Sequence, residues 1–271
     1  AMLDATHGPE TGSLFHIAPP ERPYLEEVSR APGKLKIGFT TRSPIGTEVH
    51  PEAIQAARDA AKLLESLGHH VEEAEPAIDG TQLAMDFLMM WFANCAATVD
   101  EIKKRTGCGN SGFELDTVGM AAFGHATKAS RYVEAYLRWS DYSRQLGEFH
   151  QKYDLLMTPT LAAPPAKVGQ IVTPAFEQFG LRVVLALRLE KLVMASGLIE
   201  KMARENLKWV PFTQSSNLTG TPSMSVPLNW TAGGLPLGVH FVAPHSGEGT
   251  LFRLAGQLEQ AKPWADKRPS L

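Results

Sequence analysis

Cys95 is the side chain in this sequence that could do chemistry with the fewest helpers. It lies in a predicted helix with Trp91 one turn earlier and Asn94 beside it, so the thiol and the indole share one helix face. Two interpretations stay open: a small buried hydrophobe, which is how most cysteines pack, or a thiol that lines a substrate pocket. A nucleophilic thiolate needs a cationic neighbour, and the sequence supplies none within one helical turn.

The segment 107–112 matches the glycine pattern of dinucleotide-binding loops, because it reads Gly-Cys-Gly-Asn-Ser-Gly. That function needs a strand before the loop, so that the pyrophosphate meets the N-terminus of the following helix. Residues 101–105, which precede the loop, have the composition of a polar helix end instead. We therefore predict a loop between two helices and expect no cofactor.

The histidines and serines indicate neither a metal centre nor a common serine-hydrolase motif. The nine histidines are scattered, and no H-x-x-x-H, C-x-x-C or H-E-x-x-H spacing occurs, so we expect no zinc site. A G-x-S-x-G nucleophile elbow is also missing from the sequence. A triad of distant residues stays open, because triads are assembled in space.

Composition argues against several classes of function. The chain has 271 residues, with 26 Lys plus Arg and 29 Asp plus Glu, and a formal net charge of −3. This balance gives no electrostatic reason to expect a nucleic acid or an anionic membrane as partner. The longest apolar stretch, 87–99, is shorter than the roughly 20 residues that cross a bilayer. Two cysteines and no recognisable signal peptide predict a cytoplasmic protein.

Hydrophobic periodicity predicts an α/β fold with a mixed central sheet flanked by helices. A strand at 34–39, a helix at 52–67 and a strand at 70–74 form a βαβ unit, whose two strands should be parallel. Strands at 223–228 and 237–243 flank Gly-Gly and should form an antiparallel hairpin.

The other expected elements are one strand and several helices within a single domain. A buried strand is expected at 153–160, and helices are expected at 80–105, 115–126, 128–152, 178–204 and 249–262. The proline-rich segment 9–33 is expected to be a surface connection, and residues 80–152 form a helical insert region. The tail, 263–271, is expected to be irregular.

The start of the chain looks like the last turn of a helix. Met2 to Ala5 favour a helix, and Gly8 and Pro9 would end it. A domain rarely opens with the tail of a helix and no cap before it. We therefore expect further residues upstream in the intact protein.

Several segments, in the same order, resemble the amidase signature family. Residues 154–160 resemble its D-x-L-L-x-P-T segment, and residues 212–227 resemble its F-T-x-x-x-N-x-T-G-x-P-A-x-S-x-P run. Residues 234–239 resemble its G-x-P-x-G-V-Q segment, with His240 where that family usually has Gln. Met2 to Ala5 are similar to the helix that ends the conserved half of that family. The βαβ unit that follows here is similar to the unit that follows that helix in the family. Cys95 and the C-terminal residues look most like the branch that contains aminohexanoate cyclic-dimer hydrolase.

The resemblance implies hydrolysis of a linear or cyclic carboxamide through an acyl-enzyme. The family uses a Ser nucleophile, a bridging Ser and a Lys base, and a Gly- and Ser-rich loop supplies the oxyanion hole. That loop does not occur here, because Gly233-Gly234 precedes Leu-Pro and Ser215-Ser216 lacks flanking glycines. We assign no catalytic residue to this chain. The resemblance places that set upstream, so the amidase-signature-like fold should be incomplete in residues 1–271.

The resemblance gives this chain the role of the C-terminal half of an amidase. Its partner would be an upstream N-terminal half that carries the catalytic residues, and its ligand would be a small-molecule amide. The chain would complete the sheet and wall the pocket, with Cys95, Trp91 and Asn217 as substrate-binding residues. Asn217 and Thr219 also fit a local turn. We expect no metal, nucleic acid or membrane partner, and a homodimer is compatible with this interpretation.

Two other functions stay open on the sequence alone. One is a non-catalytic α/β binding module, which the coding sequence upstream of Ala1 would exclude if it encodes a Gly-Gly-Ser-Ser loop and a Lys. The other is an independent hydrolase that uses a local Ser or Cys95. A half-sheet would leave a strand edge and an apolar face uncovered, which predicts poor solubility of the chain by itself.

Overall fold

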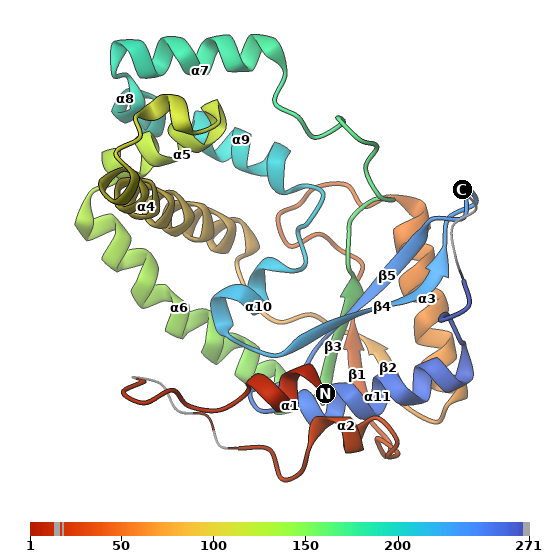
Figure 1. Cartoon of the computed structure of the whole chain (residues 1–271). Coiled ribbons are helices and arrows are strands. Elements are labelled where there is room, and N and C mark those ends of the chain that lie inside the picture. The colour runs from red at the N-terminus through yellow and green to blue at the C-terminus, as the bar shows by residue number, and fades with distance from the viewer. Residues whose placement is uncertain (14–16, 18, 268–271) are drawn as a thin grey trace. The chain divides into compact units, whose positions relative to one another are not determined.

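The computed structural model describes residues 1–13, 17 and 19–267 of the chain (Figure 1). Two compact units can be distinguished along it. The first, here called the sheet unit, comprises Ala1–Ile78, Ser143–Pro165 and Trp209–Leu271. The second, the helical unit, comprises Asp79–Tyr142 and Ala166–Lys208.

A five-stranded mixed sheet forms the centre of the sheet unit, with strand order β2-β1-β3-β5-β4. β1 pairs in parallel with β2 and with β3, whereas β5 pairs antiparallel with β3 and β4. The predicted mixed sheet, the parallel βαβ pair and the C-terminal hairpin are therefore confirmed. The strands are β1 (Lys36–Phe39), β2 (His70–Glu73), β3 (Leu155–Pro159), β4 (Ser223–Trp230) and β5 (Pro236–Val242).

One face of the sheet is buried under α3 (Pro51–Ser66) and α11 (Glu248–Ala261). Side chains alternate between the two faces of a strand, so every second residue points into this core. The packing also explains why α3 is rich in alanine on its buried side, where a small side chain lets the helix approach the strands. The main core includes Ile37, Leu64, Leu155, Met157, Leu228, Val239, Phe241, Leu254 and Leu258.

The opposite face of the sheet changes character along its length. At one end, Leu156 and Val242 pack with Leu146, Phe149 and Tyr153 in a smaller apolar cluster. Further along the same face the side chains become polar, on residues Thr158, Thr160, Ser225 and His240.

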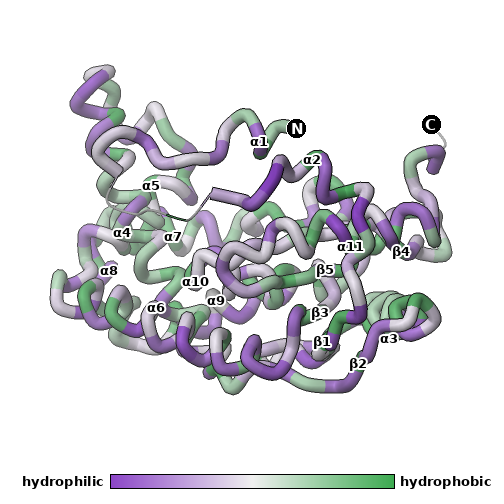
Figure 2. Tube along the Cα trace, turned by 90° about the horizontal axis from the view of Figure 1, so that it is seen from below, coloured by the Kyte–Doolittle hydropathy of each residue, from purple (hydrophilic) through white to green (hydrophobic). Residues whose placement is uncertain are grey.

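The helical unit is built from α4 (Gly80–Thr106), α5 (Leu115–Ala126) and the helices that follow them. The segment 107–112 links α4 to α5 and includes a 3₁₀ turn, so no strand precedes it. α6 (Ala129–His150) begins in this unit and ends in the sheet unit. Hydrophilic and hydrophobic residues alternate along the helices (Figure 2), and none of those in the described ranges is long and apolar enough to span a bilayer.

The sequence predicted a single helix at 178–204, and the structure has three helices in this region. They are α7 (Ala175–Leu187), α8 (Glu190–Ala195) and α9 (Leu198–Leu207). Arg188 with φ 55° and Gly197 with φ 75° adopt the left-handed conformation, which a continuous α-helix cannot contain. The prediction of one helix was wrong at these two residues.

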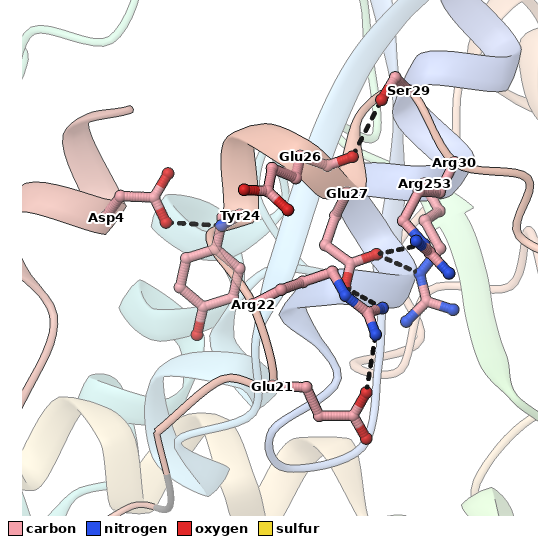
Figure 3. Close-up of polar contacts among 9 residues, drawn as sticks. All are labelled: Asp4, Glu21, Arg22, Tyr24, Glu26, Glu27, Ser29, Arg30 and Arg253. Carbon is pink, nitrogen blue, oxygen red and sulfur yellow. Dashed lines mark hydrogen bonds and ion pairs between the residues drawn. The ribbon is translucent and has the colours of Figure 1, made fainter.

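The N-terminal segment is attached to α11 through a short helix, α2 (Tyr24–Glu27) (Figure 3). The Asp4 carboxylate, on α1 (Met2–Thr6), accepts hydrogen bonds from the backbone N–H groups of Tyr24 and Leu25 at 2.5 and 2.9 Å. Glu27 is 4% exposed and forms ion pairs with Arg253 of α11 at 2.7 Å and with Arg22 at 3.2 Å. The carboxylates of Asp4 and Glu27 thereby connect the start of the chain to α2 and α11.

The tail, 263–271, was predicted to be irregular, and its residues 268–271 lie outside the described part.

Candidate functional site

Polar side chains cross the middle of the sheet on three neighbouring strands. Thr158 of β3 is the cross-strand partner of His240 of β5, and His240 is also the partner of Ser225 of β4. Residues opposite each other project from the same face. Thr160 follows β3, and its Oγ1 lies 2.7 Å from Ser225 Oγ. These four residues are called the polar row below.

Gly238 makes room for the hydroxyl pair of Thr160 and Ser225. A Cβ atom at this position would lie 2.5 Å from Ser225 Oγ and 2.7 Å from Thr160 Oγ1, which is closer than van der Waals contact allows. The two hydroxyls therefore meet across β5 because that strand carries a glycine between them.

His240 lies beside Thr158 within the sheet. Thr158 Oγ1 donates its only hydrogen to the carbonyl of Pro159 at 2.9 Å. The same oxygen lies 3.5 Å from His240 Nδ1, at the long limit for a hydrogen bond. Burial lowers the pKa of His240 to about 4, so the imidazole is neutral at pH 7.

A short polar helix, α10 (Gln214–Thr219), leads into β4. Thr219 Oγ1 donates to the Ser215 carbonyl at 2.8 Å, as expected for a residue that bonds local backbone. Ser216 Oγ is buried and has no hydrogen-bond partner among the described residues. Asn217 is exposed on this helix.

Trp91 and Cys95 lie one turn apart on α4, as the sequence predicted. Trp91 is 49% exposed, and its ring packs edge-on against the ring of Phe87 with 5.3 Å between the ring centroids. The Cys95 thiol donates to the Thr117 carbonyl on α5 at 3.7 Å, and burial raises its pKa. A thiol in this state is a weak nucleophile. Asn217 belongs to the sheet unit, so the three predicted substrate-binding residues come from both units.

A buried ion pair in the helical unit was not predicted. Asp86 is fully buried on α4, and Arg138 donates to its two oxygens at 2.6 Å each. Tyr142 donates to the same carboxylate at 2.7 Å, and burial raises the pKa of its hydroxyl. Because its oxygens accept these hydrogen bonds, Asp86 ties α4 to α6 and is not free to act as a base. In the ranges that the structure covers, no group of three His, Cys, Asp or Glu could hold a metal ion.

A protein-family model described as Amidase matches residues 1–252. This chain belongs to the amidase family. The 6-aminohexanoate-cyclic-dimer hydrolase of Pseudomonas sp. (strain NK87) is 28% identical over 100% of this chain and 53% of its own length. The putative amidase AmiC of Mycobacterium leprae (strain TN) is 31% identical over 91% of this chain and 48% of its own length. The amidase chain described here thus spans about half the length of these relatives.

Solved structures show the same fold. A 6-aminohexanoate cyclic dimer hydrolase complexed with substrate superposes with a TM-score of 0.84 at 24% identity, over 99% of this chain and 54% of that one. A bacterial aryl acylamidase of the amidase signature family superposes with a TM-score of 0.68 at 18% identity, over 91% of this chain and 49% of that one. The expected amidase-signature-like fold is confirmed.

The segments of this amidase that carry the family resemblance converge on the polar row. Thr158 and Thr160 come from 154–160, Ser225 comes from 212–227, and His240 follows 234–239. The sequence identified these segments by their resemblance to the family but did not predict the polar row. Finding the polar row requires the cross-strand register, which brings together residues that are 65 and 82 positions apart.

Proposed function

We propose that this chain is the C-terminal part of an amidase that hydrolyses a carboxamide through a Ser acyl-enzyme. The Ser nucleophile, the bridging Ser and the Lys base would lie in the part that precedes it. The observation that carries this proposal is the convergence of three family-like segments on one sheet face in a chain that covers 53% of the length of a cyclic-dimer hydrolase. The engagement of Cys95 and Asp86 in packing and hydrogen bonds supports it.

In this proposal the preceding part breaks the bond, and this chain builds the surroundings. A neutral Lys accepts the proton relayed from the nucleophilic Ser, while fixed N–H donors meet the developing oxyanion. The sheet unit supports the loop that carries these groups. Trp91 and Cys95 offer an aromatic and apolar surface suited to the methylene chain of a small linear or cyclic amide.

The experiment that tests the proposal compares two proteins. One is the 271-residue chain alone, and the other is the chain joined to the coding sequence that precedes it in its gene. We expect hydrolysis of 6-aminohexanoate cyclic dimer or of a simple aryl amide only by the joined protein. Strong turnover by the chain alone would contradict the proposal.

The predicted pocket residues need a separate test in the joined protein. We expect Trp91→Ala to raise KM about tenfold, equivalent to roughly 1.4 kcal/mol of binding, with kcat nearly unchanged. Tyr136→Ala is the matched control, because Tyr136 is an aromatic residue of the same unit with the same 49% exposure. Asn217→Ala is assayed in parallel. Equal effects of Trp91→Ala and Tyr136→Ala would remove Trp91 from the pocket.

A further inference from the structure

The N-terminal helix α1 caps another helix, α2, through the side chain of Asp4 (Figure 3). One oxygen of its carboxylate accepts from the backbone N–H of Tyr24, and the other accepts from that of Leu25, 20 and 21 residues further along. The first N–H groups of a helix have no partner within it, so a carboxylate placed there stabilises the helix. Pro23, directly before α2, makes no side-chain cap. The cap of α2 is therefore supplied by α1.

α2 is in turn attached to α11 by a buried ion pair and by a close backbone contact. Glu27 is 4% exposed, and its carboxylate lies 2.7 Å from Arg253 Nε of α11. Gly256 of α11 lies so close to the Val28 carbonyl that a Cβ atom would overlap it. α11 itself belongs to the main core of the sheet unit. Short contacts at each step thus fix α1 relative to the sheet.

The ring of Tyr24 contacts aromatic rings from both sides of this attachment. Its centroid lies 5.8 Å from that of His7, which directly follows α1, and 5.5 Å from that of Phe252 on α11. Both distances are within the range of favourable aromatic pairs. Tyr24 is only 9% exposed. α1 is therefore packed onto the sheet unit by apolar as well as polar contacts.

The outer side of α1 is apolar and exposed, in contrast to the side that carries Asp4. Met2 is 84% exposed and Leu3 is 37% exposed. In the proposed function, the part that precedes this chain continues directly from α1. The chain covers 53% of one cyclic-dimer hydrolase, so a comparable length of polypeptide is available to lie against these residues. The preceding part of the same enzyme is the occupant to which α1 is covalently joined.

We infer that Asp4 is a positioning residue: by capping α2 it fixes the point at which the preceding part of the amidase joins the sheet unit. Asp4 acts through the backbone of α2, and α2 acts through Glu27 on α11. This inference rests on the proposed function, because it needs a preceding part that carries the nucleophile. It goes beyond that function by naming the residue of this chain that holds the catalytic groups in place.

The kinetic test uses the joined protein, which is the whole enzyme. We expect Asp4→Ala to lower kcat about tenfold while KM stays within about twofold, because misplaced catalytic groups slow the chemical step. We expect Asp4→Asn to restore kcat to within about threefold of wild type, because Asn caps helices as well as Asp does. Unchanged kcat in Asp4→Ala would overturn the inference. A rise in KM at constant kcat would also overturn it, because it would indicate an effect on substrate binding.

Glu26 provides the matched control, because it is an exposed acid on α2 itself. Its backbone carbonyl accepts from Ser29, and its carboxylate has no hydrogen bond or ion pair with the described residues. Glu26→Ala therefore removes a negative charge near the attachment without removing the cap. We expect kcat to stay within about twofold of wild type. A fall equal to that of Asp4→Ala would show that charge alone matters, and would overturn the role of the cap.

Hydrogen exchange in the joined protein remains decisive if Asp4→Ala does not fold. In wild type we expect slow exchange of the Tyr24 and Leu25 amides, because Asp4 accepts from both. In Asp4→Asn we expect exchange there to rise by no more than about tenfold, with β1 unchanged. Fast exchange of the two amides in wild type would overturn the inference. A joined wild-type protein that hydrolyses no amide would contradict the proposed function instead.

Discussion

At the scale of single residues, the buried imidazole of His240 makes stability depend on pH. Its ordinary pKa is 6.5, and burial lowers this to about 4 in the folded chain. Below pH 6.5 the unfolded chain therefore binds a proton that the folded chain does not. The free energy of unfolding is therefore unaffected by this group above pH 6.5. It falls as the pH drops from 6.5 towards 4, by about 3 kcal/mol in total.

This prediction can be checked by urea denaturation at pH 7 and pH 4.5. We expect wild type to lose about 2 kcal/mol or more relative to His240→Gln between these two values, because Gln does not titrate. The cross-strand neighbours Thr158 and Ser225 are uncharged and add no competing titration. A constant difference between the two proteins would show that folding does not lower the pKa of His240.

Asp86 is the residue whose loss should most weaken the helical unit. Asp86→Ala removes a fully buried carboxylate and leaves Arg138 and Tyr142 without the group to which they donate. Breaking a buried pair in this way costs about 3–5 kcal/mol. The control is Asp100→Ala on the same helix, since the side chain of Asp100 is 54% exposed and faces His125. It should cost less than about 1 kcal/mol in a denaturant titration. Similar losses in the free energy of unfolding of the two variants would show that the buried contacts of Asp86 do not stabilise the helical unit.

At the scale of elements, the contact of α2 with α11 depends on Gly256. A Cβ atom there would overlap the carbonyl group of Val28, so Gly256→Ala must push the two helices apart. We expect a loss of about 1–3 kcal/mol in the free energy of unfolding. Gly147→Ala on α6 is the matched control in the same unit, because no described atom beyond the neighbouring backbone of its own helix lies within 4 Å of its Cβ position.

The control should change stability in the opposite direction. Alanine is favoured over glycine in a helix by about 0.5–1 kcal/mol, so Gly147→Ala should stabilise the chain. Thermal unfolding of both variants measures the difference. Stabilisation by Gly256→Ala would mean that α2 does not pack closely against α11.

Regular elements were predictable where the local pattern agreed with the tertiary structure. The helix at 115–126 was predicted with the observed bounds, and the βαβ pair was found because Gly68 ends α3 shortly before β2. The break at Arg188 could not be predicted, because its left-handed backbone carries no signal in the residue type. α10 was missed because six residues rich in Ser, Thr and Asn show no apolar period.

The candidate site was predicted less well than the fold. Trp91 and Cys95 share a helix face as expected, since that relation is local. The polar row could not be found in the same way, because it needs the position of β3 between β1 and β5. That order is set by the packing of distant segments, which no local pattern encodes.

At the scale of the whole molecule, the sheet ends in β4, a strand of eight residues whose described neighbour is β5. An unpaired strand edge favours association between chains. We therefore expect the 271-residue chain alone to aggregate on heating, and the joined protein to resist aggregation. Light scattering during thermal unfolding tests this. A sharp, reversible transition of the chain alone without scattering would argue against an uncovered edge.

The most direct measurement of the central claim locates the nucleophile. The joined protein is treated with a serine-reactive fluorophosphonate, digested and sequenced by mass spectrometry. We predict that the modified residue is a Ser in the part that precedes Ala1, and that residues 1–271 remain unlabelled. Stoichiometric modification of any Ser within residues 1–271, with loss of activity, would contradict the account.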